Sequence, residues 1–171
     1  MNFIPVIRHD QPEASLIYNA YCKAFPENER RSKEQYLRLF DTGEAEILLI
    51  KHETEKIGYL ILWKLSDCVY IEHFEIFPEF RSRKFGSLVL RKLHQIYPET
   101  VLESEPEDQD DIAERRIRFY ERNGFHIIDR EYIQPSYGEG KKSLHLYLLS
   151  TVRMDAGKVS REIHHTVYGA H

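Results

Sequence analysis

Apolar side chains recur along this chain at two different spacings, and each spacing predicts one kind of element. A recurrence every three to four residues indicates a helix that turns one face toward the core. That spacing is found in three segments, 12–25, 88–97 and 110–123. A further helix is expected after Ser32, because Ser32 and Gln35 have the spacing of a capping box.

Runs rich in apolar and β-branched residues lie between these helices and predict strands. The runs are 3–8, 46–52, 56–65, 68–77, 100–105, 125–133 and 143–150. Strands and helices in this mixed order predict an α/β (α+β) domain with helices on both sides of one sheet. We place that domain at residues 1–152 and expect the tail, 153–171, to be a short helix or disordered.

The composition and charge are those of an ordinary folded protein, and they exclude several other classes of protein. Hydrophobic residues make up 42% of the chain, and the net charge is -4 with a pI near 6.1, so no basic surface for nucleic acid is expected. No apolar run approaches the roughly 20 residues of a membrane helix, and the N-terminus lacks a secretory signal. The only cysteines, Cys22 and Cys68, lie in unrelated contexts. We therefore expect a cytoplasmic protein with no disulfide framework and no metal site.

The segment between the strand 68–77 and the next helix has the chemistry of a phosphate-binding loop. Residues 81–87 read RSRKFGS and lead directly into that helix. Amides in the first turn of a helix lack internal partners, and the helix dipole adds partial positive charge there. Gly86 would allow the backbone to approach a pyrophosphate closely, and the two arginines would add charge. A solvated loop of the same composition is the alternative.

A second informative segment, residues 113–125, reads AERRIRFYERNGF and closes a predicted helix. Tyr120 lies near the end of that helix, and Gly124 is the residue expected to terminate it. A tyrosine in such a place is commonly a core residue whose hydroxyl reaches the surface. On its own, therefore, this segment does not decide between a structural and a chemical role for Tyr120.

Together, and in this order, the two segments resemble the GNAT superfamily of acyl-CoA-dependent N-acyltransferases. RSRKFG at 81–86 is similar to the family's R/Q-x-x-G-x-G/A loop, and FYERNGF at 119–125 is similar to its FYxxxGF helix end. Lys84 departs from the pattern, since the family has a glycine there. The resemblance covers roughly residues 3–150. It implies the GNAT fold, a central, mixed, mainly antiparallel and splayed sheet of about seven strands flanked by about four helices.

The resemblance also implies a cosubstrate and the residues that hold it. Acetyl-CoA would donate an acetyl group to a primary amine of a small molecule or peptide, by direct attack in a ternary complex. Pantetheine would run along the strand at Phe74 and Ile76. The loop residues expected to hold the pyrophosphate are Arg81, Ser82, Arg83, Lys84, Phe85, Gly86 and Ser87.

Two residues are expected to move the protons of this reaction. Tyr120 matches the family's tyrosine that protonates the departing thiolate. Glu72 lies where some relatives carry an acid that serves the acceptor amine. Strand alternation places Glu72 with Phe74 on one face and His73 with Glu75 on the other. His73 is the alternative proton acceptor if its face reaches the site.

The residues that would bind the acceptor carry weaker signals. Glu103 could hold a cationic amine, or the acidic run that it begins could be a solvated loop at the start of the next helix. Glu29 and Arg30 lie between the first two predicted helices, where the family covers its acceptor pocket. Tyr137 belongs to a long loop that could act as a lid. These four residues are our candidates for substrate binding.

Three other interpretations stay open from the sequence. The first is a non-catalytic acyl-CoA-binding or sensing module on the same fold, which needs no acid at Tyr120. The second is an acyltransferase that uses a longer acyl group or an oxygen acceptor. The third is an interaction domain whose tail, 152–171, mediates dimerisation into a homodimer.

Overall fold

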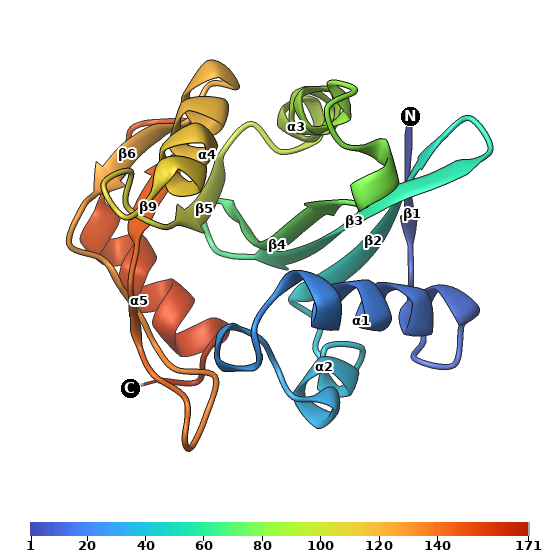
Figure 1. Cartoon of the computed structure of the whole chain (residues 1–171). Coiled ribbons are helices and arrows are strands. Elements are labelled where there is room, and N and C mark those ends of the chain that lie inside the picture. Colours follow the sequence, from blue (N-terminus) through green and yellow to red (C-terminus); the bar gives the residue numbers. More distant parts are fainter. Residues whose placement is uncertain (171) are drawn as a thin grey trace. The chain divides into compact units, whose positions relative to one another are not determined.

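The computed structural model describes residues 1–170 of the 171-residue chain, so the last position of the predicted tail lies outside the described residues. Strands and helices follow one another along the chain as labelled in Figure 1. Their bounds are β1 (Asn2–Pro5), α1 (Pro12–Ala24), the 3-10 helix η1 (Glu27–Glu29), α2 (Lys33–Arg38), β2 (Ala45–His52), β3 (Glu55–Lys64), β4 (Val69–Ile76), the 3-10 helix η2 (Pro78–Phe80), α3 (Phe85–Ile96), β5 (Thr100–Ser104), α4 (Asp111–Arg122), β6 (His126–Asp129), β7 (Ile133–Gln134), β8 (Leu144–His145), β9 (Tyr147–Ser150) and α5 (Ala156–Thr166).

Seven of the strands are hydrogen-bonded in the order β1-β2-β3-β4-β5-β9-β6, and β7 pairs separately with β8. The predicted sheet of about seven strands is therefore confirmed. The described residues contain five α-helices rather than about four, because the predicted tail forms α5. The chain folds as two compact units. Unit 1 comprises residues 1–64 and 71–89, and unit 2 comprises residues 65–70 and those from 90 onward.

In unit 1, helices cover both faces of the strands. α1 and α2 lie on one side of β2 and β3, and the first turns of α3 lie on the other (Figure 1). Burial along these strands is accordingly continuous rather than alternating, over 47–50 in β2 and 57–63 in β3. The capping box predicted for α2 is present, since the Ser32 hydroxyl accepts from the Gln35 amide and the Gln35 side chain accepts from the Ser32 amide.

A glycine in β3 fixes how closely the end of β4 packs. A Cβ atom at Gly58 would lie 2.1 Å from the carbonyl oxygen of Glu75. Any side chain at this position would push β4 away from β3, because a backbone atom cannot yield as a flexible side chain can. Gly58 therefore holds the backbone of β4 in place at Glu75.

In unit 2, β9 pairs antiparallel with β5 on one side and with β6 on the other. Asp110 caps the start of α4, and its carboxylate accepts from the amides of Ile112 and Ala113 at 2.8 Å. The helix is followed by Gly124 with φ +89, the left-handed conformation predicted for its end. Asp155 caps the start of α5, which buries Val159 and other apolar residues of one face.

The last two predicted strands, 125–133 and 143–150, are each divided into two short ones. The first gives β6 and β7, and the second gives β8 and β9. The pairing of β6 with β9 shifts register between Ile127 and Asp129, which marks an irregularity in the ladder. The sequence pattern located both runs but not the interruption within each.

Candidate functional site

The predicted phosphate loop lies in unit 1, between the end of β4 and the start of α3. α3 begins at Phe85, and the Leu88 amide donates to the Lys84 carbonyl at 3.2 Å. The amides of residues 85–87 precede this bond and are the open donors of a helix N-terminus. The Arg83 guanidinium lies 5.2 Å from the centre of the Phe85 ring. This contact keeps the positive charge of Arg83 near these amides. This arrangement suits an anion such as a pyrophosphate.

Two residues of the loop adopt the left-handed backbone conformation. Ser82 has φ 60 and Lys84 has φ 63. A residue with a side chain loses about 1–2 kcal/mol in this region, whereas a glycine does not. Lys84 therefore occupies the conformation of the glycine that it replaces in the family pattern. The loop keeps its turn despite the departure, and the Lys84 side chain is exposed.

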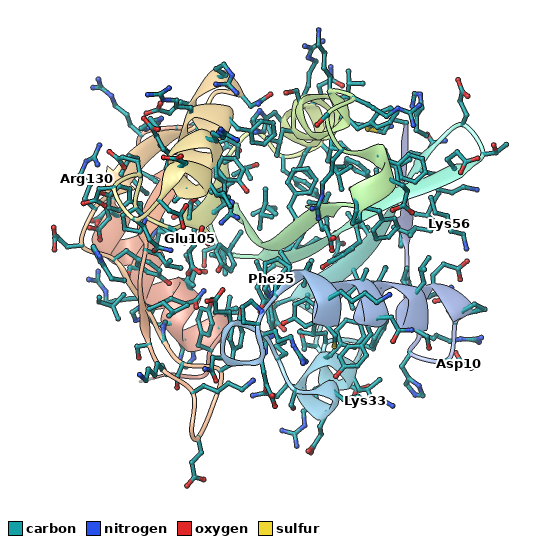
Figure 2. All side chains as sticks on the ribbon, in the orientation of Figure 1. Asp10, Phe25, Lys33, Lys56, Glu105 and Arg130 are labelled. Carbon is teal, nitrogen blue, oxygen red and sulfur yellow. The ribbon has the colours of Figure 1, made fainter. Side chains whose placement is uncertain are left out.

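Burial along β4 follows the predicted alternation. Counted as whole residues, backbone included, Glu72, Phe74 and Ile76 are half-buried, whereas His73 and Glu75 are buried. The buried face turns toward α1, because the His73 ring lies edge-on to other aromatic rings of unit 1. Those rings are Tyr21, at 4.7 Å between centres, and Phe25 (labelled in Figure 2), at 4.5 Å. Burial lowers the pKa of His73 to about 4, so the ring is neutral at pH 7.

The Glu72 carboxylate is enclosed, and each of its oxygens accepts a hydrogen bond. One oxygen accepts from Arg31 Nε at 2.8 Å, and the other accepts from Trp63 Nε1 at 2.6 Å. No surface of the Glu72 side chain is exposed. The other candidates of this segment, Glu29 and Arg30, are half-buried at the end of η1. The carboxylate expected to serve the acceptor amine is thus fixed in position by a charge-assisted hydrogen bond.

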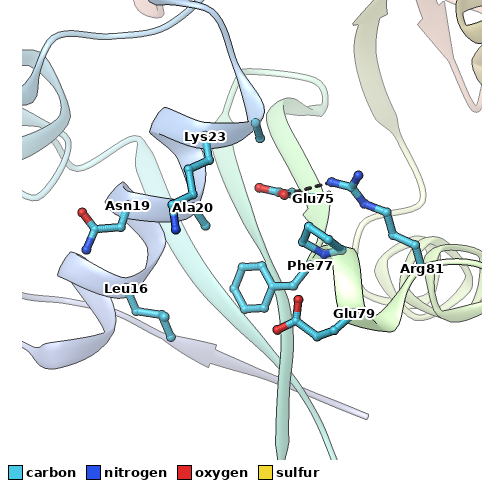
Figure 3. A pocket seen from close by; sticks show the side chains of 10 residues that line it. Leu16, Asn19, Ala20, Lys23, Glu75, Phe77, Glu79 and Arg81 are labelled. Carbon is cyan, nitrogen blue, oxygen red and sulfur yellow. Dashed lines mark hydrogen bonds and ion pairs between the residues drawn. The ribbon is translucent and has the colours of Figure 1, made fainter.

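A groove of about 470 Å³ lies between α1 and the end of β4 (Figure 3). Glu75 extends into it from β4, and the Arg81 guanidinium meets one of its oxygens at 3.1 Å from the opposite side. Arg81 also donates to the Ile76 carbonyl at 3.0 Å, so it joins the phosphate loop to the end of the strand. Burial raises the pKa of the Glu75 carboxyl above its usual value.

Tyr120 lies in unit 2, in the last turn of α4. Its ring packs edge-on against Phe125 at 5.7 Å, and the Tyr120 carbonyl accepts from the Phe125 amide. Its hydroxyl forms no hydrogen bond with residues 1–170. Burial raises the pKa of Tyr120 to about 12, so the phenol remains protonated at neutral pH. It is therefore a donor without a partner in the part of the chain that is described.

Glu103 and Tyr137 share one cluster of unit 2. The Glu103 carboxylate accepts from the Tyr132 hydroxyl and the Gln134 amide at 2.5 Å and from the Tyr168 hydroxyl at 3.2 Å. Burial raises the pKa of Glu103. Tyr137 is buried, and its ring centre lies 5.2 Å from that of Tyr168. This cluster joins β5, the loop after β6 and the end of α5.

The structure thus brings some predicted residues together inside each unit. Unit 1 contains the phosphate loop, Glu72 and the segment with Glu29 and Arg30; unit 2 contains Tyr120, Glu103 and Tyr137. Sequence reasoning missed the partners of Glu72 and the groove beside Glu75. No local sequence pattern predicts the Arg31–Glu72 contact, because the two residues are separated by 41 positions along the chain.

No group of three or more His, Cys, Asp or Glu side chains among residues 1–170 is placed to hold a metal ion. No helix in this range is long and apolar enough to cross a bilayer.

Comparison with known proteins shows which family these features belong to. The sequence model described as the acetyltransferase (GNAT) family matches residues 14–125, a range that includes both the phosphate loop and Tyr120. This chain belongs to the GNAT acetyltransferase family. The GNAT fold implied by the sequence is also confirmed. A GNAT-family protein from Bacteroides thetaiotaomicron, named as an acetyltransferase, superposes with a TM-score of 0.93 over 100% of both chains at 29% identity.

Two further proteins are similar to this GNAT protein, one in sequence and one in structure. YjbC of Bacillus subtilis (strain 168), named as an acetyltransferase, is 27% identical over 110 residues, which are 63% of this chain and 55% of YjbC. The match thus spans about half the length of that curated relative. A GNAT acetyltransferase from Elizabethkingia anophelis, solved with acetyl-CoA bound, has a TM-score of 0.59 at 18% identity, over 89% of this chain and 97% of its own.

Proposed function

We propose that this GNAT protein transfers the acetyl group of acetyl-CoA to a primary amine of a small molecule or peptide. The observation that carries the proposal is the loop of residues 81–87. It turns through two left-handed residues and leaves the first amides of α3 without partners inside the helix. The loop lies within the range that matches the GNAT family model. Those amides and Arg83 would hold the pyrophosphate, and pantetheine would run along β4 at Phe74 and Ile76. The relative from Elizabethkingia anophelis, which has acetyl-CoA bound, supports this choice of cosubstrate.

The chemistry requires one bond to form and one to break, with two proton movements. The amine nitrogen attacks the thioester carbon, a C–N bond forms, and the C–S bond breaks to release CoA thiolate. We assign the proton of the amine to Glu72, which would receive it through an intervening water, because its side chain is enclosed and Arg31 and Trp63 hold its carboxylate in place. We assign the proton for the thiolate to Tyr120, whose hydroxyl forms no hydrogen bond within residues 1–170.

A second candidate is a non-catalytic acyl-CoA-binding module, which needs no acid at Tyr120. The pKa of Tyr120, raised to about 12, lies above that of a free thiol, about 8.5. Complete proton transfer from this phenol to a thiolate is therefore uphill. The enzyme proposal instead requires Tyr120 to stabilise the developing thiolate by a hydrogen bond while the C–S bond breaks.

The proposal is tested by release of CoA thiol from acetyl-CoA in the presence of polyamines, amino acids, aminoglycosides and peptides with a free N-terminus. We expect amine-dependent release with a matching acetylated product by mass spectrometry. We also expect Glu72→Gln to lower kcat by about 10²-fold. Binding of acetyl-CoA without thiol release for any of these amines would favour the binding module instead.

A further inference from the structure

The first residue of the phosphate loop is tied to the end of β4 by its own side chain. The Arg81 guanidinium donates through Nε to the Ile76 carbonyl at 3.0 Å and through Nη2 to Glu75 Oε1 at 3.1 Å. Figure 3 shows Arg81 reaching back across this gap to the Glu75 carboxylate. Glu75 and Ile76 are the last two residues of β4, so the loop starts from a fixed point on that strand.

The Glu75 carboxylate that receives Arg81 is itself held from β3. The Glu75 side chain is only 8% exposed, and the buried Tyr59 hydroxyl donates to it. Gly58 precedes Tyr59 on the strand, and a Cβ atom there would lie 2.1 Å from the Glu75 carbonyl oxygen. The side chain and the backbone of Glu75 are therefore both held against β3. A carboxylate in this state has little freedom to follow a guanidinium that moves, so it fixes where Arg81 points.

Arg81 keeps donors for an anion while it is held in this way. A guanidinium carries five N–H groups, and the contacts with Glu75 and Ile76 use two of them. The Arg81 side chain is 55% exposed, so other N–H groups of the guanidinium are open to solvent. A planar fork that is held at two points presents its remaining donors in a fixed direction, which suits the oxygens of a pyrophosphate.

We propose that Glu75 is a positioning residue for the cosubstrate, which orients the Arg81 guanidinium toward the pyrophosphate of acetyl-CoA without touching it. This assignment rests on the proposed function, in which residues 81–87 hold acetyl-CoA. A free arginine loses rotamer freedom when it binds a phosphate, whereas Arg81 has lost it already in the folded protein. The Glu75 charge, by contrast, repels a bound phosphate. Orientation and charge therefore predict opposite effects when Glu75 is replaced.

Calorimetric titration of the full-length protein with acetyl-CoA distinguishes the two effects. Glu75→Met keeps the length of the side chain but offers Arg81 no oxygen, and we expect it to weaken acetyl-CoA binding about tenfold. Glu75→Gln removes the same charge but keeps an acceptor oxygen, so its affinity should stay close to that of the wild type. If both variants bound acetyl-CoA as tightly as the wild type or more tightly, the positioning role would be excluded.

A double-variant cycle tests whether Glu75 acts through Arg81. Arg81→Met should itself weaken acetyl-CoA binding about tenfold, and adding Glu75→Met should then weaken it no further. An equal loss from Glu75→Met in both backgrounds would contradict the proposal. The matched control for charge is Glu79→Gln, which removes an exposed carboxylate of η2. It should bind acetyl-CoA at least as tightly as the wild type, and thermal unfolding without ligand checks that every variant is folded.

Turnover separates this role from the proposed function. In Glu75→Met, KM for acetyl-CoA should rise about tenfold with kcat unchanged, because Glu75 contributes equally to the bound cosubstrate and to the transition state. A lower kcat with an unchanged KM would place Glu75 in the chemical step and refute the proposal. If the wild type binds acetyl-CoA but acetylates no amine, acetyl transfer fails and the binding results still decide the role of Glu75. If the wild type does not bind acetyl-CoA, both fail.

Discussion

Replacing Tyr120 with phenylalanine should lower kcat for acetyl transfer by about 10²- to 10³-fold. The Tyr120 hydroxyl forms no hydrogen bond within residues 1–170, and its raised pKa keeps it protonated at neutral pH. Its removal therefore deletes a donor that is free to stabilise the departing thiolate. The measurement is the steady-state rate of CoA thiol release with the best acceptor found in the amine panel.

The stability of the Tyr120→Phe variant serves as a control for its folding. Because the Tyr120 hydroxyl bonds to nothing in the described residues, its loss should change the free energy of unfolding by less than about 0.5 kcal/mol. The ring contact with Phe125 is retained by phenylalanine. Acetyl-CoA should also stabilise the variant as much as the wild type. A rate that equals the wild-type rate would remove Tyr120 from the mechanism and favour the binding module.

Replacing Arg31 with alanine should lower the free energy of unfolding by about 3–5 kcal/mol, because it leaves the Glu72 carboxylate buried without its cation. The two side chains are 9% and 0% exposed, and the Arg31 guanidinium also lies 5.3 Å from the centre of the Trp63 ring. Urea unfolding monitored by circular dichroism measures the loss.

An exposed pair on α2 provides the matched control. Arg38 and Glu34 form an i,i+4 ion pair in which the side chains are 70% and 75% exposed. Arg38→Ala should therefore cost less than about 1 kcal/mol. Adding Glu72→Gln to Arg31→Ala should recover part of the loss, because the uncompensated charge is removed. Equal losses in Arg31→Ala and Arg38→Ala would show that Glu72 is not held as described.

The elements that sequence reasoning located are those with local signals. The capping box at Ser32 and the glycine after α4 act within a few residues, and both are present. The tail's apolar residues, Val159 and Ile163, have helical spacing and are buried in α5. The sequence alone does not decide its helical form, because a short amphipathic segment becomes ordered only through tertiary packing.

What the sequence left undecided depends on contacts between distant segments. Alternation along β4 gave the correct faces, but it carried no information on what each side chain meets. Glu72 and Glu75 are both carboxylates on one strand, yet one accepts from Arg31 and Trp63 and the other from Arg81 of the phosphate loop. The left-handed turn at Lys84 is likewise a property of the folded backbone. A lysine in place of the family's glycine does not predict that conformation.

The central claim, that the loop of residues 81–87 holds acetyl-CoA, is tested most directly by thermal unfolding of the protein with and without this cosubstrate. At 100 times its Kd, acetyl-CoA should stabilise the native state by about 2.7 kcal/mol. For a domain of this size that corresponds to a rise in Tm of roughly 5–10 °C. A rise with acetyl-CoA is the predicted result. An unchanged Tm at millimolar acetyl-CoA would contradict the claim and, with it, the proposed transfer reaction.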